Sequence, residues 1–304
     1  MKQAYRYGKV HQQAELIVTR VTEQFVWRYA YARALETQNV REKGQDYLTF
    51  ARNEESFLFA LCDGVSLSYC GELAAKILGD SLLDWLASDV IDQEEQKEFL
   101  LQHLNRHLQA LTTVSSKIVV NHPLPSSITG MLKDVLESKR MHGSETMYIC
   151  GRIDLPSLSF PEGRILFAWQ GDLRLRLFSQ EQEITECLKG TFHTQERWST
   201  LHGPVGGKPH LFQSSLAGQH CVTRMIAYTD GLATLDKCYP LPTDNELQSM
   251  ILQASDSPLS DDIALLDVCW NQIDSFTPNN KTGHSESGSL GLRDKINSIV
   301  RRLV

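Results

Sequence analysis

Four aspartates stand beside apolar runs of the chain, in positions where their carboxylates could do chemistry together. They are Asp46, Asp63, Asp230 and Asp261, and a glycine follows two of them. If the runs are strands, each acid lies at a strand end, where a fixed backbone can hold its oxygens toward a cleft. Clustered carboxylates repel one another and stay ionised only when a cation neutralises them. The pattern therefore predicts either one metal site or, as is usual for isolated aspartates, four solvated turn residues.

The types of these residues narrow the choice of metal and reaction. Carboxylate oxygens without converging histidine or cysteine favour Mg²⁺ or Mn²⁺. Two such ions would lower the pKa of a bridging water and orient it for in-line attack on phosphorus. Arg41, shortly before Asp46, could hold phosphate oxygens in a bidentate manner. The reaction that these residues would support is the hydrolysis of a phosphate ester.

The stretch around Asp63 carries the clearest structural pattern. Residues 57–62 form an apolar run that is too short and too aromatic for a helix, which predicts a buried strand. Gly64 would let the chain turn after it and bring a backbone carbonyl close to whatever Asp63 binds. Taken alone, an Asp-Gly dipeptide more commonly closes a turn after a strand.

The order of the expected elements indicates the fold class. Strands are expected at 25–34, 47–50, 57–62, 146–153, 164–170, 173–179, 222–229 and 263–270, and helices at 71–87, 94–111, 128–139 and 244–254. Residues 115–127 are expected to form a loop or a small insertion, and residues 203–209 are expected to form a loop. The pattern assigns no element to residues 1–20 and is weak over 180–217. Strands, then helices, then strands again predict an α+β fold of antiparallel sheets covered by helices.

Composition and charge exclude several classes of protein. The 304 residues are 41% hydrophobic and 22% charged, as in ordinary globular proteins, and carry a formal net charge of -7. Without a dense Lys/Arg stripe, nucleic acid is not expected as a main partner. The N-terminal residues have no apolar signal region, and no stretch of about 18 apolar residues occurs, so neither a signal peptide nor a transmembrane span is expected.

The seven cysteines are scattered and contain no CxxC pair. An odd, dispersed set argues against zinc or a disulfide framework and for reduced thiols, which predicts a cytoplasmic protein. Cys62, Cys150 and Cys269 lie inside apolar runs and are expected to pack as small hydrophobic residues.

The chain is expected to contain one domain followed by two short segments. The domain spans residues 1–275, and residues 276–291 are rich in Asn, Gly and Ser, which predicts a flexible linker. Residues 292–304 are expected to form a basic amphipathic helix with apolar residues at helical spacing. Two interpretations of this helix stay open: it docks on its own domain, or it binds a partner or a membrane surface.

Six short segments, in this order, resemble the metal-dependent protein phosphatase family, the PPM or type 2C serine/threonine phosphatases. The family boxes R-x-x-N-Q/E-D, D-G-x-G-G-x-x-x-G-E, G-S-T, G-D-S-R, S-D-G-L and D-N/D-x-T resemble residues 41–46, 63–72, 143–146, 171–174, 229–232 and 261–264. Each box is weak alone, but the six occur in the family's order over about residues 25–270. The chain is similar to the bacterial members.

The resemblance assigns roles to the acids named above. It implies that Asp63 bridges two metal ions and that the backbone carbonyl of Gly64 binds one of them. It further implies that Asp230 and Asp261 hold the first ion, while Asp46 supports the site directly or through water. Two ions of Mn²⁺ or Mg²⁺ are the implied cofactors.

The resemblance also implies a substrate and a fold. Arg41 would take the substrate phosphate, and a metal-activated water would attack phosphoserine or phosphothreonine without a covalent intermediate. The implied fold is an antiparallel β-sandwich flanked by α-helices, with a dinuclear metal cleft at one end. Residues 1–275 would then be a phosphatase-like catalytic domain acting on proteins phosphorylated by a serine/threonine kinase.

The chain also departs from the family pattern. The family's Gly-Gly is Ser66-Leu67 here, and Ser68 replaces a histidine often found in that loop, so no general acid is identified. His142 is the nearest candidate in sequence order, although a surface histidine is the commoner interpretation. Thr234 stands where many members carry a second acid, which leaves Asp172 as the main ligand of a possible third metal. These departures keep open an alternative function, a weak or inactive phosphatase-like module that binds phosphoproteins as a scaffold or regulator.

Overall fold

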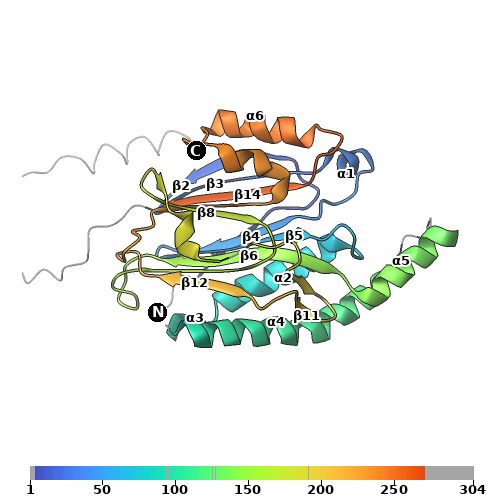
Figure 1. Cartoon of the computed structure of the whole chain (residues 1–304), viewed down its shortest axis with the longest axis horizontal. Coiled ribbons are helices and arrows are strands. Elements are labelled where there is room, and N and C mark those ends of the chain that lie inside the picture. Colours follow the sequence, from blue (N-terminus) through green and yellow to red (C-terminus); the bar gives the residue numbers. More distant parts are fainter. Residues whose placement is uncertain (1–3, 94–95, 125, 127, 191, 271–304) are drawn as a thin grey trace, which may run out of the picture.

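The structure, a computed structural model, describes residues 4–270 except 94–95, 125, 127 and 191. Two antiparallel sheets stack face to face and are flanked by helices (Figure 1). The first sheet has the order β1 (Arg6–Lys9), β4 (Tyr47–Arg52), β5 (Ser56–Gly64), β6 (Glu145–Asp154), β10 (Arg197–Ser199), β11 (Gly203–Val205), with β7 (Arg164–Gln170) beside β6 and β12 (His210–Ser214) beside β7. The second has the order β2 (Leu16–Thr22), β3 (Phe25–Ala32), β14 (Ile263–Trp270), β13 (Arg224–Tyr228), β8 (Arg174–Ser179), β9 (Gln182–Glu183).

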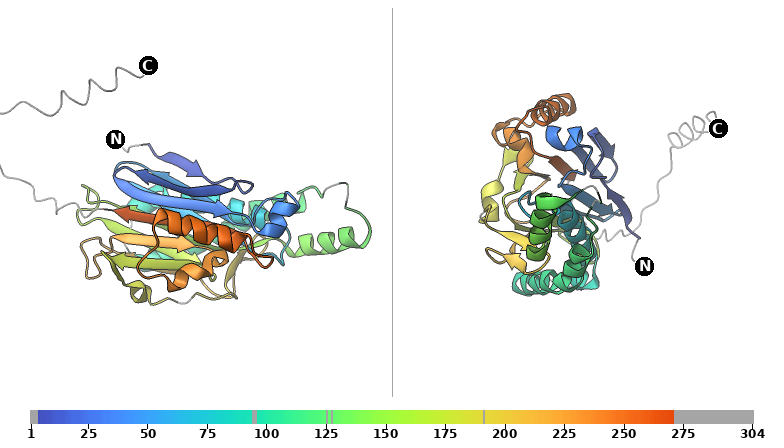
Figure 2. Two further views of the ribbon diagram at one scale, coloured as in Figure 1. Left: turned by 90° about the horizontal axis from the view of Figure 1, so that it is seen from above. Right: turned by 90° about the vertical axis from the view of Figure 1, so that its right-hand side faces the viewer.

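The helices cover the outer faces of the two sheets, as Figure 2 shows from two further sides. The long helices on the first sheet are α2 (Gly71–Leu86) and α4 (Lys97–Val120), and α6 (Asp244–Ser255) with the 3-10 segment η2 (Asp230–Lys237) covers the second. The shorter elements are α1 (Leu35–Asn39), α3 (Asp89–Gln93), α5 (Gly130–His142) and η1 (Thr185–Leu188). The predicted fold class, an α+β antiparallel sandwich flanked by helices, is confirmed.

The apolar run of β5 is continuous because the strand is buried on both faces. Phe57, Phe59 and Leu61 belong to the core between the sheets, whereas Leu58, Ala60 and Cys62 pack under the helices of the first sheet. Successive side chains of a strand point to opposite faces. Asp63, next to the last residue of β5, therefore lies on the same face as Phe57, Phe59 and Leu61, between the two sheets. The sequence thus delivers a carboxylate to one end of the sandwich, between the two sheets.

The expected loop at 115–127 is wrong for its first part, because α4 continues to Val120. Ser115 is buried, and its hydroxyl donates to the carbonyls of Leu111 and Thr200, so a polar residue replaces an apolar one on the covered face of the helix. Val119 is also buried and extends that face by one turn. The prolines that suggested a loop, at 123 and 125, come only after the helix ends.

Several short strands fall where the sequence pattern assigned no element. β1 and β2 lie within or near the unassigned N-terminal residues, and β9, β10, β11 and β12, together with the 3-10 segment η1, lie within 180–217. The loop expected at 203–209 is wrong at its start, where β11 pairs with β10. Most of these strands are only two to five residues long, and β1 is largely exposed, so neither length nor alternation marks them.

Three further expectations concern the ends of the chain and its thiols. The linker predicted at 276–291 and the helix predicted at 292–304 lie outside the described residues. No helix of the described part is long and apolar enough to cross a membrane. All seven cysteines lie in the described part and are free; Cys62 and Cys150 are buried as expected, whereas Cys269 is only half-buried, on the outer face of the second sheet.

Candidate functional site

The predicted acids come together at one end of the sandwich. Asp46 directly precedes β4, Asp63 stands near the end of β5, Asp230 follows β13, and Asp261 precedes β14. The charges of Asp230 and Asp261 act on Asp63, and the charge of Asp63 acts on Asp46. Asp172, in the turn between β7 and β8, acts on both Asp63 and Asp230. Segments far apart in the sequence therefore form one acidic cluster.

The cluster is electrostatically unfavourable without a cation. Burial, together with the charges of the neighbouring carboxylates, raises the pKa of Asp63 well above its ordinary value. The same two causes, in the same order, raise the pKa of Asp46 and of Asp230. A guanidinium, Arg174, acts in the opposite direction on Asp230 but ranks behind the acids. A bound divalent cation would relieve this repulsion.

The donor chemistry of the cluster fits a hard divalent cation. It offers carboxylate oxygens and the backbone carbonyl of Gly64, which are the ligands that Mg²⁺ and Mn²⁺ prefer. Within the described residues, no three His, Cys, Asp or Glu side chains are already arranged to hold one ion. Asp63, Asp230 and Asp261 are thus close enough to repel one another but are not drawn together into a preformed ligand set.

Asp46 is the most firmly fixed member of the cluster. It is buried, and one of its carboxylate oxygens accepts a 2.7 Å hydrogen bond from the Thr229 hydroxyl. That hydroxyl oxygen also accepts from the backbone N–H of Ala264 at 2.9 Å, and the Tyr31 hydroxyl donates to the Asp46 carbonyl. Thr229 therefore joins the start of β4 to the facing ends of β13 and β14, a role that its position in a sequence box does not reveal.

Gly64 allows three backbone segments to meet at the site. A Cβ atom placed on Gly64 would lie 2.5 Å from the carbonyl carbon of Gly71 and 2.9 Å from the carbonyl oxygen of Gln45. Gly71 begins α2, so the end of β5, the start of that helix and the loop before β4 meet here. No side chain other than hydrogen fits this crossing.

We expect the substitution Gly64→Ala to separate these three backbones. Because the clash is with backbone atoms, the loss of unfolding free energy should be about 1–3 kcal/mol, as for other overpacked sites. Urea denaturation measures it. A suitable control is Gly218→Ala, where the nearest atom is the rotatable Ser215 hydroxyl oxygen. Equal stability losses in the two variants would contradict the proposed crossing.

Asp262 is an acid of this region that the sequence pattern left aside in favour of Asp261. It is buried, and its carboxylate accepts hydrogen bonds from the backbone N–H groups of Ala34 and Gln45. It therefore ties the segment between β3 and β4 to the start of β14. Asp261, in contrast, is exposed, and within the described part of the chain its carboxylate accepts only from the N–H of Asp262. The pair of acids before an apolar run indicates that one of them is buried, but the sequence does not show which one.

Arg41 lies in the segment that Asp262 fastens. Its backbone has a φ of +57°, a left-handed conformation that is uncommon for a residue with a side chain. The residue is exposed, and among the described residues its guanidinium makes no hydrogen bond or ion pair. The structure places Arg41 in the loop that leads into the acidic cluster, without a contact between its side chain and the acids. Its five N–H donors are available to an anion.

The positions considered for a third metal differ in their surroundings. Asp172 is half-buried at the turn, and the Arg174 guanidinium donates both to the Asp172 carbonyl and to the carboxylate of Asp236. Thr234 is exposed in η2. The charge of Asp172 therefore acts on the acids of the cluster, whereas Thr234 carries no charge.

The two positions considered for a general acid have structural contacts. His142 ends the exposed helix α5, and its ring nitrogen Nδ1 lies 2.8 Å from the Ser138 carbonyl of the same helix. The Ser68 hydroxyl donates to the Val65 carbonyl and accepts from the N–H of Glu145. Ser68 thus holds the loop after Asp63 against the start of β6.

Comparisons with known proteins identify the fold. No family model and no curated protein matches the sequence. A bacterial serine phosphatase is similar in structure with a TM-score of 0.54 and 15% identity, over 81% of this chain and 98% of that one. A serine/threonine phosphatase from Staphylococcus aureus gives 0.53 and 15%, over 85% and 98% of the two chains. The chain therefore has the fold of the type 2C serine/threonine phosphatases.

Proposed function

We propose that this protein hydrolyses phosphoserine and phosphothreonine in proteins at a two-metal aspartate site. The observation that carries the proposal is the cluster of mutually repelling carboxylates at one end of a phosphatase fold. Asp63 would bridge two ions, with the Gly64 carbonyl on one of them and Asp230 and Asp261 on the first ion. Mn²⁺ and Mg²⁺ are the proposed cofactors. A cytoplasmic location and an opposing serine/threonine kinase stay predictions.

The residues around the cluster would divide the remaining work. The bound ions would acidify a water and orient it for in-line attack on phosphorus. Arg41 would bind the phosphate oxygens of the substrate, and Asp46 would hold its position through Thr229 and support the ligands. Asp172 is the proposed ligand of a possible third ion. No residue is assigned as general acid, so the leaving oxygen would take its proton from solvent.

A second candidate function is a phosphoprotein-binding module with little or no turnover. Two observations favour it: the structural contacts of Ser68 at the family's histidine position, and the exposed Thr234 where many family members carry an acid. Tight binding of a phosphopeptide without hydrolysis in millimolar Mn²⁺ would support this function over the first.

The proposal is tested by metal titration of hydrolysis, with p-nitrophenyl phosphate and a phosphoserine peptide as substrates. We expect activity only with Mn²⁺ or Mg²⁺, complete loss in EDTA and a decrease of at least about a hundredfold in Asp230→Asn, because even weakening a group behind a metal ligand costs 10- to 100-fold. The control Asp256→Asn replaces an exposed acid at the end of α6 and should retain activity. Activity that survives EDTA would refute the two-metal proposal.

A further inference from the structure

A second charged site lies on the outer face of the second sheet, at the opposite end of the strands from the acidic cluster. There, an open cavity of about 710 Å³ is bounded by the start of α6 and by β2, β3, β13 and β14. Arg20, Arg28 and Arg224 line it, one from each of three strands. Cys269, near the end of β14, and Val26, its partner on the neighbouring strand β3, also line the cavity.

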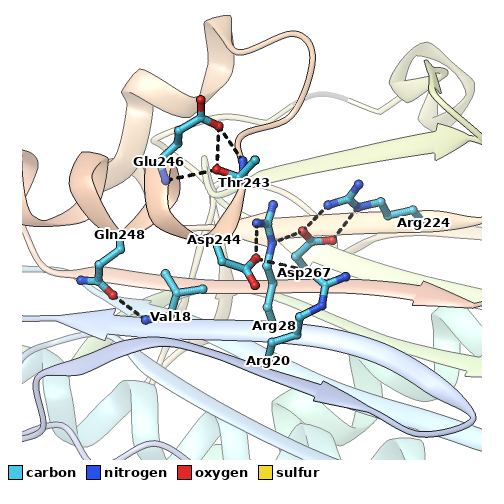
Figure 3. Close-up of polar contacts among 9 residues, drawn as sticks. All are labelled: Val18, Arg20, Arg28, Arg224, Thr243, Asp244, Glu246, Gln248 and Asp267. Atoms are coloured by element: carbon cyan, nitrogen blue, oxygen red, sulfur yellow. Dashed lines mark hydrogen bonds and ion pairs between the residues drawn. The ribbon is translucent and has the colours of Figure 1, made fainter.

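Two carboxylates hold the three guanidiniums in place (Figure 3). Asp267 is buried and accepts from Arg28 Nε at 2.7 Å and from Arg224 Nε and Nη2 at 2.8 and 2.6 Å. Asp244, the first residue of α6, accepts from Arg28 Nη1 at 2.8 Å and from Arg20 Nη1 at 3.3 Å. The guanidiniums are therefore oriented before any ligand arrives, which lowers the entropy lost on binding.

The acids do not use all the donors of the arginines. Among the described residues, Arg28 Nη2, Arg224 Nη1 and the Nε and Nη2 of Arg20 donate to no protein acceptor. Three guanidiniums against two carboxylates leave one net positive charge on the lining. The side chain of Arg28 is 5% exposed, that of Arg224 24% and that of Arg20 52%. Arg28 is therefore buried, whereas Arg20 is accessible to a ligand from solvent.

The start of α6 fixes one side of the cavity. Thr243 and Glu246 form a reciprocal capping box, so the first turn of the helix is fixed beside the cavity. The N-terminal end of a helix carries a partial positive charge, part of which Asp244 already offsets. The exposed Glu181 acts weakly on Arg224 from outside the lining. The Glu246 carboxylate, which accepts from Thr243, adds a further negative charge beside the lining, so the preference of the cavity for an anion rests on the unused N–H donors of its guanidiniums.

We propose that this cavity binds a phosphate monoester through Arg20, Arg28 and Arg224. A planar guanidinium matches the oxygens of a phosphate, and dianionic phosphate accepts from several such groups at once. The volume exceeds that of one phosphate group and is in the range of ligand sites, so a phosphorylated side chain with its neighbours would fit. The inference does not depend on turnover at the acidic cluster, since neither a metal nor Asp63 takes part.

A purely structural role, in which the network only fastens α6 to the sheet, is the competing explanation. It is tested best at Arg20, because this half-exposed side chain makes one long contact to Asp244 and contributes little to that fastening. Variants of Arg28 and Asp267 are avoided, since both are buried and their loss would disturb folding.

The experiment titrates metal-free protein in an Arg41→Gln background, which removes the other guanidinium expected to bind phosphate. The probes are inorganic phosphate, a phosphoserine peptide and its unphosphorylated form, and the arginine Nε–H signals are followed by NMR. We expect both phosphate probes to shift the signals of Arg28 and Arg224, and Arg20→Gln to weaken their binding roughly tenfold or more. Arg106→Gln, an exposed arginine of α4, is the matched control and should change nothing.

The outcomes separate the possible sources of the ligand. Tighter binding of the phosphopeptide than of phosphate supports the site with a phosphoprotein as its ligand, and equal affinities support it with free phosphate. Absence of shifts with both probes, or unchanged affinity in a normally folded Arg20→Gln variant, overturns the proposal. Hydrolysis of p-nitrophenyl phosphate should be the same in Arg20→Gln and wild type, so failure of this site is distinguishable from failure of the proposed function.

Discussion

Replacing Asp63 by asparagine is expected to remove metal-dependent hydrolysis and, at the same time, to stabilise the metal-free protein. As the proposed bridging ligand it is needed for both ions, so activity should decrease at least about a hundredfold. Its raised pKa, caused by burial and by Asp230, Asp261 and Asp172, means that the ionised form is disfavoured in the fold. Removing that charge should therefore increase the unfolding free energy at neutral pH by about 1 kcal/mol or more.

Thermal denaturation with and without Mn²⁺ measures both parts of this prediction. An ion at a hundred times its dissociation constant should stabilise the wild type by about 2.7 kcal/mol and Asp63→Asn by much less. The exposed Asp134→Asn, on α5, serves as control. If Mn²⁺ raised the melting temperature of Asp63→Asn as much as that of the wild type, Asp63 would not be a ligand.

The pH dependence of this effect has a definite sign. A carboxyl whose folded-state pKa is raised contributes stability at low pH that is lost as the pH rises from its ordinary value through the raised one. The advantage of Asp63→Asn over the metal-free wild type should therefore be small near pH 4 and grow toward neutral pH. Unlike total stability, this difference excludes the ion pairs that act in the opposite direction.

The largest loss of stability is expected for Asp154→Ala, far from the acidic cluster. Asp154 is buried and accepts from Arg152 Nε at 2.7 Å, from Arg164 Nη2 at 2.8 Å and from the Ser56 hydroxyl at 2.6 Å. Both arginine side chains are only 4% exposed. Removing their shared carboxylate leaves two buried cations close together, with Asp92 still 2.7 Å from Arg152 Nη2, which should cost about 3–5 kcal/mol.

Urea denaturation of Asp154→Ala beside Glu137→Ala tests this expectation. Glu137 pairs with Lys133 on the exposed face of α5 at 3.8 Å, with both side chains half-exposed, so its loss should cost less than about 1 kcal/mol. Similar losses in the two variants would show that burial does not govern these pairs. Below its melting temperature Asp154→Ala should retain the metal dependence of the wild type.

The sequence predicts those helices and strands in which burial requires a regular pattern of apolar residues. The run at 57–62 is readable because both faces of β5 are covered, and the range predicted for α2, 71–87, ends one residue beyond the observed helix. The sequence pattern predicts the end of α4 too early, because a buried serine beyond it, Ser115, bonds to carbonyl groups. Edge and very short strands such as β1 and β11 show no readable pattern, because β1 is largely exposed and pairs with the distant β4, and β11 has only three residues.

The candidate site could be predicted as a set of residue types but not as an arrangement. An acid at the end of each apolar run indicates where carboxylates lie, since strand ends meet when the strands share a sandwich. Which of Asp261 and Asp262 faces inward depends on the loop that each one reaches, and the sequence carries no local sign of this. The arginine cavity left no motif either, because its three cations are brought together only by strand register.

The bond between Asp46 and Thr229 joins residues 183 positions apart, and this separation has a kinetic consequence. Contacts of such high sequence separation form late, after the entropy of closing a long loop has been overcome. We therefore expect the acids to be apart, and not yet to repel one another, while the chain is still folding. A cation that recognises only the completed cluster would leave the folding rate unchanged and slow the unfolding rate, and so would prolong the lifetime of the native state.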